Sequence, residues 1–140
     1  MPSAGLSRKY TCSMISPDGK YIFIGTSGGE ICIYNIQSRV FKALLHVSVN
    51  GIWAIIWFNG VVFVGSGDGK VKKLVGQETK WVLDREVLLK GRVTTLSADP
   101  FHNEILAGTS TGNIYRIFPD DLSATLHTEG HVTPINDVAF

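Results

Sequence analysis

An all-β fold made of repeated four-stranded units is predicted for this chain, from a repeated turn and a regular series of short apolar segments. Three copies of one phrase occur at nearly even spacing: IGTSGGEI at 24–31, VGSGDGKV at 64–71 and AGTSTGNI at 107–114. The second glycines of the copies, Gly29, Gly69 and Gly112, are 40 and then 43 residues apart. A period of this size, with several strands in each unit, is typical of the blades of a β-propeller.

The first repeat, about residues 8–49, is predicted to form four antiparallel strands. A Ser-Pro-Asp-Gly sequence at 16–19 indicates a tight turn between the first two strands, because proline presets φ and glycine accepts a positive φ later in the turn. The first glycine turn then separates the second strand from the third. The four predicted strands are residues 10–15, 21–26, 30–35 and 40–46.

The second and third repeats, about residues 50–91 and 92–129, have the same organisation. Asn59-Gly60 is a strong hairpin signal in the second repeat, because both residues tolerate a positive φ. A fourth repeat begins at 130–140 and reaches only its first strand, residues 135–140. The other predicted strands are residues 52–58, 61–66, 71–75 and 81–89 in the second repeat, and 93–98, 105–109, 113–118 and 122–127 in the third.

The segment 52–58 is apolar on both faces of the predicted strand. Successive side chains of a strand alternate between its faces. This places Ile52, Ala54, Ile56 and Phe58 on one side and Trp53, Ile55 and Trp57 on the other. A strand that is apolar on both sides needs cover on both sides, so the second repeat is predicted to pack between two neighbouring blades.

The number of repeats does not close a ring. Propellers use about four to eight blades, and this chain provides three blades and one further strand over residues 1–140. We therefore expect the chain to be a fragment of a longer protein, or to associate with further copies. An open blade face would expose apolar area beyond what soluble monomers usually tolerate, so self-association through these faces is predicted.

Charge argues against binding to nucleic acid or to anionic membranes. The formal net charge is +1, which gives no basic field to attract polyanions. The densest basic cluster is Lys70, Lys72 and Lys73, interpreted as the solvated side of a strand.

No feature of the sequence indicates a membrane or secreted protein. The longest apolar run, 52–58, is too short to span a bilayer, and residues 1–6 lack the pattern of a signal peptide. Cys12 and Cys32 lie in predicted strands without metal-binding spacing. They are interpreted as reduced thiols of an intracellular, cytoplasmic protein, with a disulfide as the lesser alternative.

The glycine turns could suggest a phosphate-binding loop, but their sequence favours hairpin turns. The copy at 67–70 lacks the spacing of a phosphate loop and the Ser or Thr after its lysine. No helix follows it, so no helix dipole is available to hold an anion. No cofactor site is therefore predicted.

Catalytic and metal sites are also not predicted. The histidines, His46, His102, His127 and His131, are scattered, whereas a metal site needs three or four converging ligands. Ser66, His131 and Asp137 have no spacing that indicates a triad, and Asp120-Asp121 sit in a predicted turn, where joint acid–base work is not expected. A propeller enzyme would need catalytic groups that converge near the central channel of the propeller. The strands expected to line that channel provide mainly Thr11, Ser13, Thr94 and Thr95, without clustered carboxylates or histidines.

Taken together, the Ser-Pro-Asp-Gly turn, the three glycine turns and the pair Gly130-His131 resemble a WD40 repeat domain. The resemblance implies that His131 has a structural role in a hydrogen-bond network within a blade. The expected Trp-Asp dipeptides are replaced by Tyr34-Asn35, Leu74-Val75 and Ile117-Phe118. The Asp before the turn glycine is present only as Asp68, with Gly28 and Thr111 at the matching places. We therefore expect these blades to depend more on apolar packing than the family's blades do.

The order of motifs from about residue 16 onward is similar to a WD-repeat family of motile cilia and flagella. The motifs that carry this similarity are VGSGDG at 64–69, GRVTTL at 91–96, AGTSTGNIYR at 107–116 and NDVAF at 136–140. Members of that family are longer and carry two propellers. The resemblance implies a non-catalytic scaffold on axonemal doublet microtubules, with tubulin and axonemal proteins as partners. The alternatives are an adaptor in another intracellular complex, such as trafficking or ubiquitination, and a propeller enzyme.

Overall fold

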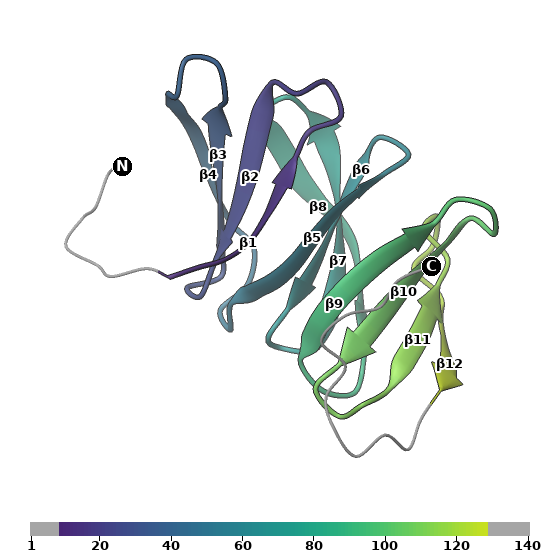
Figure 1. The fold of residues 1–140 in the computed structure, drawn as a ribbon. Helices are drawn as coiled ribbons and strands as arrows, with labels where there is room; N and C mark the ends of the chain where they lie inside the picture. The colour runs from purple at the N-terminus through teal and green to yellow at the C-terminus, as the bar shows by residue number, and fades with distance from the viewer. Residues whose placement is uncertain (1–8, 129–140) are drawn as a thin grey trace.

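The computed structural model describes residues 9–128, and all of the regular structure in this range is β-strand (Figure 1). Three four-stranded antiparallel sheets follow one another along the chain, each with its strands in sequence order. Blade 1 contains β1 (Tyr10–Ile15), β2 (Tyr21–Thr26), β3 (Glu30–Asn35) and β4 (Phe41–His46). Blade 2 contains β5 (Ile52–Phe58), β6 (Val61–Ser66), β7 (Lys70–Gln77) and β8 (Lys80–Leu88). Blade 3 contains β9 (Val93–Asp99), β10 (Glu104–Thr109), β11 (Ile114–Ile117) and β12 (Ala124–Thr128).

The three blades stand side by side in an open arc, with blade 2 in the middle (Figure 1). Where the blades meet, β5 packs against β1 and β2, and β9 packs against β5 and β6. The first strands of the three blades thus lie next to one another. They therefore form the inner side of the arc, and β4, β8 and β12 form the outer edges. This confirms the predicted fold class of three four-stranded antiparallel propeller blades. The predicted strand at 135–140 lies outside the described residues, and the repeat limits stay a prediction.

Two apolar cores hold the arc together, one on each face of blade 2. The core toward blade 1 is formed by Phe23, Ile31, Ile33, Ile52, Ile55, Val62, Val64, Leu74 and Trp81. The core toward blade 3 is formed by Ala54, Phe58, Phe63, Val71, Leu89, Val93, Leu96, Ile105, Ala107, Ile117 and Leu122. Each large side chain buried in this way contributes about 1.5–3 kcal/mol relative to exposure to water. Packing between blades therefore contributes substantially to the stability of this arc.

The inner strands share a β-bulge, which corrects one prediction. The pairing register shifts at Thr11 in β1, at Trp53 in β5 and at Thr94 in β9. One extra residue in a strand reverses the face of the residues before it. Ile52 consequently packs toward blade 1, whereas Ala54, Ile56 and Phe58 pack toward blade 3. The prediction that placed Ile52 on the same side as Ala54 was wrong for this reason.

The first two glycine turns lie against the connections that lead to the next blade. The carbonyl of Gly29 accepts hydrogen bonds from the N–H groups of Val47 and Ser48, at 2.9 and 3.0 Å. The carbonyl of Gly69 accepts a bond of 2.7 Å from Leu89 in the same way. Gly29 has a φ of +89°, and a Cβ at this position would overlap the carbonyl of Ser48. The repeat therefore marks places where two backbones touch.

The two cysteines are free thiols on opposite sides of blade 1. Cys12 pairs with Gly25 and packs toward blade 2, whereas Cys32 pairs with Ile24 on the other face. A disulfide between them would have to pass through the sheet, so the alternative of a Cys12–Cys32 disulfide is excluded.

Candidate functional site, an aromatic groove between two blades

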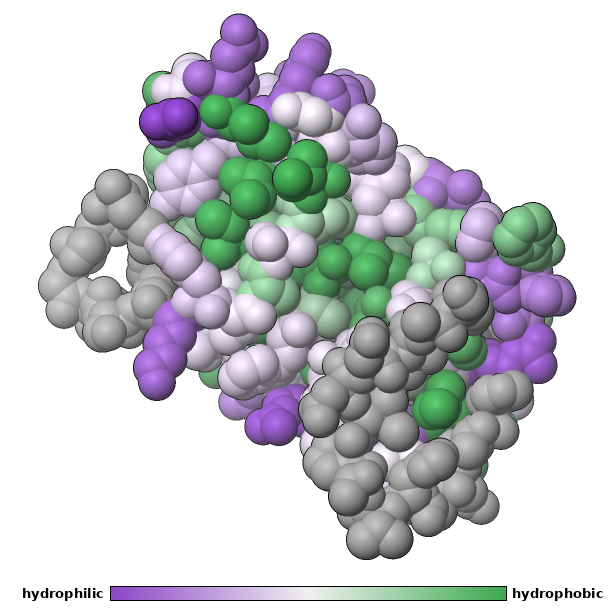
Figure 2. Space-filling view, viewed as in Figure 1, coloured by the Kyte–Doolittle hydropathy of each residue, from purple (hydrophilic) through white to green (hydrophobic). Residues whose placement is uncertain are grey.

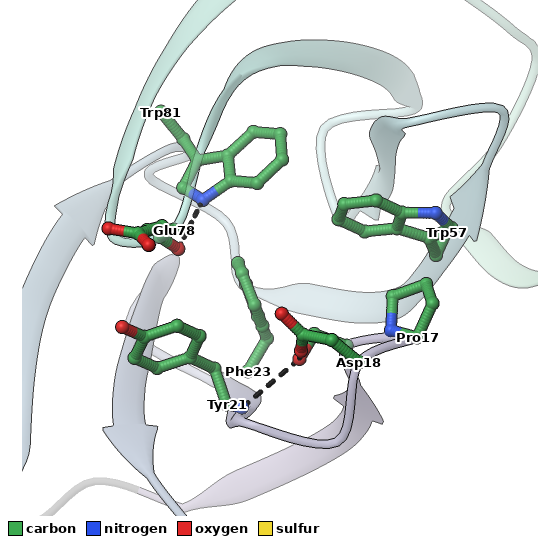
Figure 3. Close-up of a pocket in the computed structure, with 8 residues that line it drawn as sticks. Pro17, Asp18, Tyr21, Phe23, Trp57, Glu78 and Trp81 are labelled. Carbon is green, nitrogen blue, oxygen red and sulfur yellow. Dashed lines mark hydrogen bonds between the residues drawn. The ribbon is translucent and has the colours of Figure 1, made fainter.

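A groove of about 170 Å³ lies where blade 1 meets blade 2 (Figure 3). Blade 1 supplies the turn between β1 and β2 and the start of β2. Blade 2 supplies the end of β5 and the turn between β7 and β8. The lining residues are Ser16, Pro17, Asp18, Tyr21, Phe23, Trp57, Glu78 and Trp81.

Three aromatic rings of the groove fix one another in edge-to-face geometry. The ring of Trp81 lies 5.9 Å from that of Phe23 at an interplanar angle of 76°, and 5.6 Å from that of Trp57 at 80°. The indole N–H of Trp81 donates a hydrogen bond of 2.9 Å to the carbonyl of Glu78. Edge-to-face pairs add about 0.5–1.5 kcal/mol beyond area burial. The aromatic wall is therefore rigid before any ligand arrives.

The carboxylate of Asp18 faces this wall from the turn of blade 1. Its Oδ1 accepts hydrogen bonds from the Ser16 hydroxyl at 2.6 Å and the Lys20 N–H at 3.0 Å. The Ser16 hydroxyl in turn accepts a bond of 3.0 Å from the N–H of Tyr21. These bonds, the one from Ser16 first, lower the pKa of Asp18. Asp18 is thus charged at neutral pH and held in place by its own turn.

Sequence reasoning identified the turn at 16–19 but not the groove. Trp57 and Trp81 belong to β5 and β8, and Phe23 and Asp18 belong to the neighbouring blade. No local spacing connects these residues, because only the packing of one blade on the next brings them together. The sequence signal that could have pointed to the groove was the presence of aromatic residues near strand ends in two successive repeats.

The rim that carries the glycine turns holds a buried lysine, which corrects another prediction. Lys72 is only 7% exposed. Its ammonium group donates a hydrogen bond of 2.8 Å to the carbonyl of Val47 in blade 1, and lies 3.5 Å from Glu86 and 3.9 Å from Asp68. The basic cluster of β7 is therefore not simply a solvated strand face, because the chain leaving blade 1 covers Lys72.

Asp68 is predicted to stabilise the fold in a pH-dependent way. Burial disfavours its charged form, but the hydroxyl of Ser66, the N–H of Lys70 and the ammonium groups of Lys72 and Lys70 outweigh burial and lower the pKa of Asp68. An Asp in the unfolded chain has a pKa of about 3.9. The stabilisation is therefore complete above that value and is lost as the pH falls through the lower folded-state pKa.

The variant Asp68→Asn should consequently cost about 1–2 kcal/mol at about pH 6, and progressively less below about pH 4. Urea unfolding of both proteins at several pH values measures the difference in free energy of unfolding. Asp84→Asn, at an exposed position of β8, is the control. A cost of Asp68→Asn that does not change with pH would show that the charge of Asp68 is not what stabilises the turn.

The histidines are not brought together in the described part of the chain. His46 ends β4, with its Nδ1 3.5 Å from Glu30, and His102 lies in blade 3, with its Nδ1 2.6 Å from Asp99. The backbone of His127 belongs to β12, near the end of a fourth strand as predicted. His131 lies outside the described residues. Within residues 9–128, no three His, Cys, Asp or Glu side chains are grouped so that they could hold a metal ion.

The other polar residues considered for chemistry have local structural partners. The Ser66 hydroxyl bonds to Asp68 and to the carbonyl of Lys70. Asp121 accepts a bond of 2.9 Å from the N–H of Ser123, in the turn before β12. Asp137, the third residue weighed with Ser66 and His131, lies outside the described residues.

Two of the threonines expected near the channel, Thr11 and Thr94, donate hydrogen bonds to backbone carbonyls. The Thr11 hydroxyl donates to the carbonyl of Ile52 in the neighbouring blade, and the Thr94 hydroxyl donates to Gly108 at 3.2 Å. Ser13 is exposed on β1 and Thr95 is half-buried on β9.

Across the stretch from residue 9 to residue 128, no helix has the length and apolar character needed to cross a membrane.

The fold defines the class of this molecule as an open part of a β-propeller. A chain in a crystal structure of the mitotic checkpoint complex superposes with a TM-score of 0.84 at 14% identity, covering 95% of this chain and 41% of that one. The β-propeller domain of Cps50 (Swd1) from Myceliophteria thermophila gives a TM-score of 0.72 at 17% identity, covering 87% and 39%. No protein-family model matches the chain.

Among curated proteins, the chain is similar to cilia- and flagella-associated protein 52. The Sus scrofa protein is 25% identical over 132 residues, covering 90% of this chain and 21% of the relative. The Bos taurus protein is 24% identical over 129 residues (88% and 20%), and the Homo sapiens protein 24% over 132 residues (90% and 21%). The chain thus spans about a fifth of the length of these relatives. The similarity to a WD-repeat family of cilia and flagella, which was predicted from the sequence, is confirmed by these three relatives.

Proposed function

We propose that this protein is a non-catalytic scaffold for protein–protein interactions in the axoneme of cilia or flagella, where it associates with doublet microtubules. The observation that carries the proposal is the similarity of one arc of three blades to the same ciliary protein in three mammals, over about nine-tenths of this chain. Tubulin and axonemal proteins are the proposed partners, and the cytoplasmic axoneme is the proposed location.

The physical features of the arc suit a binding role. Propeller blades hold their connecting loops on two rigid rims, and binding residues are often found on loops that a rigid scaffold positions. One rim here carries the aromatic groove, and the other carries the glycine turns with Lys72. We propose three blades at about 8–49, 50–91 and 92–129, with a fourth beginning at 130–140.

The test is localisation of the tagged full-length protein in flagellated cells, followed by detergent extraction of axonemes. The proposal expects the protein to stay with axonemes after membranes and soluble material are removed, and to be released with doublet components by high salt. Staining away from axonemes would overturn the ciliary role and favour an adaptor in a trafficking or ubiquitination complex. Turnover of a substrate that co-purifies with the protein would favour a propeller enzyme.

The outer face of blade 1 supports the proposal that this chain self-associates. Ile15, Ile22, Ile24, Tyr34 and Leu44 lie on the side of the sheet away from blade 2. Ile15 is 60% exposed, and Figure 2 shows hydrophobic residues gathered over the region of blade 1.

The corresponding face of blade 3 is more polar. There Arg116 pairs with Glu104 through a hydrogen bond of 2.9 Å from its Nε. Because an apolar face gains little from a charged one, two copies should meet through their blade 1 faces rather than head to tail.

Ile15→Glu should therefore abolish self-association, because a charge in an apolar interface loses its hydration without a partner. Light scattering during gel filtration across a concentration series measures the mass. The wild-type mass should rise toward that of a dimer, whereas Ile15→Glu stays monomeric. Val82→Glu, at an exposed position of β8, is the control and should behave as wild type. A wild-type chain that stays monomeric at every concentration would contradict the proposal.

A further inference from the structure

We propose that the groove between blades 1 and 2 binds the cationic side chain, arginine or lysine, of a partner protein segment. This inference rests on the proposed role as an interaction scaffold, and it assigns a ligand chemistry to one site of that scaffold. The site is the one in Figure 3, with Trp57, Trp81 and Tyr21 around it and Asp18 at one side.

The charge of the lining selects for a cation. The groove has two carboxylates, those of Asp18 and Glu78, and no Lys or Arg among its lining residues. Both hydrogen bonds that Asp18 receives in its turn go to Oδ1. In Figure 3 the other carboxylate oxygen points into the space between the aromatic rings. An anion placed there would meet the negative charge of Asp18, and a neutral apolar group would leave the inward carboxylate oxygen without water or partner.

The aromatic wall adds a second attraction for the same ligand. A cation over the face of Trp or Tyr is attracted by the ring quadrupole, and the attraction grows when water is displaced. Trp57 and Tyr21 are half-buried and border the groove. Trp81 is 6% exposed and is held by its bond to Glu78. The ammonium or guanidinium group would thus be placed between rings and a carboxylate that are already fixed.

The shape of the site suits a side chain that arrives on a polypeptide. The apolar stem of Lys or Arg packs well on apolar surface while its charged end stays near a polar partner. Pro17 and Trp57 lie side by side at the margin of the groove (Figure 3), and Pro17 is exposed. They offer a ledge for the residues that flank the cationic side chain. The planar guanidinium group can also stack on an aromatic ring while one of its N–H groups donates to the free oxygen of Asp18, so arginine should bind more tightly than lysine.

The test titrates the 140-residue chain with four short peptides of one polar sequence. Their central residue is arginine, lysine, citrulline, which is the neutral analogue of arginine, or glutamate. Indole fluorescence and NMR shifts of the Trp side-chain N–H groups report binding. We expect the arginine peptide to bind best, the lysine peptide more weakly, and the other two at least tenfold more weakly than arginine. Binding should weaken as salt is raised, because a partly exposed ion pair is screened.

Two variants separate this site from general attraction of basic peptides. Asp18→Asn keeps an oxygen that can accept the bonds from Ser16 and the Lys20 N–H, so the turn is retained, and should weaken arginine binding about tenfold. Trp57→Ala should weaken it by a similar factor. Asp84→Asn removes an exposed carboxylate outside the groove and should leave binding unchanged. Circular dichroism checks the fold, and Glu78→Gln replaces Asp18→Asn if the latter does not fold.

Equal binding of the arginine and citrulline peptides would overturn the proposal, and so would unchanged arginine binding by Asp18→Asn. Binding of free guanidinium or tetramethylammonium as tightly as the arginine peptide would also overturn it, in favour of a small-cation site. These outcomes are separate from the proposed function. Retention of the full-length Asp18→Asn protein on axonemes would leave the scaffold role standing even if the groove binds no cation.

Discussion

Gly29→Ala is expected to unfold blade 1, with a loss of more than about 4 kcal/mol in the free energy of unfolding. The backbone of Gly29 has a φ of +89°, and an added methyl group would occupy the position of the Ser48 carbonyl. Relieving that overlap would pull the turn away from the chain that leads to blade 2. It would also break the bonds from Val47 and Ser48 to the carbonyl of Gly29. Urea unfolding followed by tryptophan fluorescence and circular dichroism measures the loss.

Gly60→Ala is the matched control for this variant. Gly60 has a φ of +78°, close to that of Gly29, but no atom lies within 4 Å of the position that a Cβ would take. It should cost only the backbone strain, about 1–2 kcal/mol. Similar costs for the two variants would contradict the claim that backbone contact, and not conformation alone, requires glycine in the repeated turn.

Trp81→Ala is expected to cost about 3–5 kcal/mol. Trp81 is 6% exposed, belongs to the core between blades 1 and 2, and contacts the rings of both Phe23 and Trp57. Its removal would leave a cavity at the blade interface, and the carbonyl of Glu78 would lose its indole donor. Thermal and urea unfolding measure the cost.

Two further substitutions separate packing from the hydrogen bond. Trp81→Phe keeps an aromatic ring and loses the N–H, so it should cost clearly less than Trp81→Ala. Trp57→Ala removes a half-buried ring at the margin of the same groove and should also cost less. If Trp57→Ala destabilises as much as Trp81→Ala, the interface depends on the groove margin rather than on the buried core.

The strand order and the turns were predictable because both are local. The Ser-Pro-Asp-Gly and glycine turns restrict φ at known positions, and the apolar segments between them have strand length. The face assignment of Ile52 was not predictable, because the bulge at Trp53 depends on pairing with β6. A strand can show the alternating pattern in its sequence, and its side chains can still change face at a bulge.

Burial of Lys72 and the aromatic groove were missed for a different reason. Both depend on contacts between blades: Lys72 meets the Val47 carbonyl of blade 1, and Trp81 meets Phe23 of blade 1. A lysine within a basic run has the same local sequence whether water or a neighbouring blade covers it. Comparing the three repeats could have revealed these buried positions only if the repeats carried the same residues there, and at the matching positions their residues differ.

Blade 2 contributes to both apolar cores, so the three blades form a linear array in which the middle blade makes both interfaces. Within residues 9–128, the extensive contacts between blades join blade 2 to blade 1 and to blade 3. The stability of the arc is therefore close to a sum of three blade terms and two interface terms. A substitution that unfolds blade 1 or blade 3 removes one interface and leaves the other two blades packed together. A substitution that unfolds blade 2 removes both interfaces at once and leaves blades 1 and 3 as separate single sheets. Tolerance to substitution should therefore depend less on the residue type than on which of the three sheets holds it.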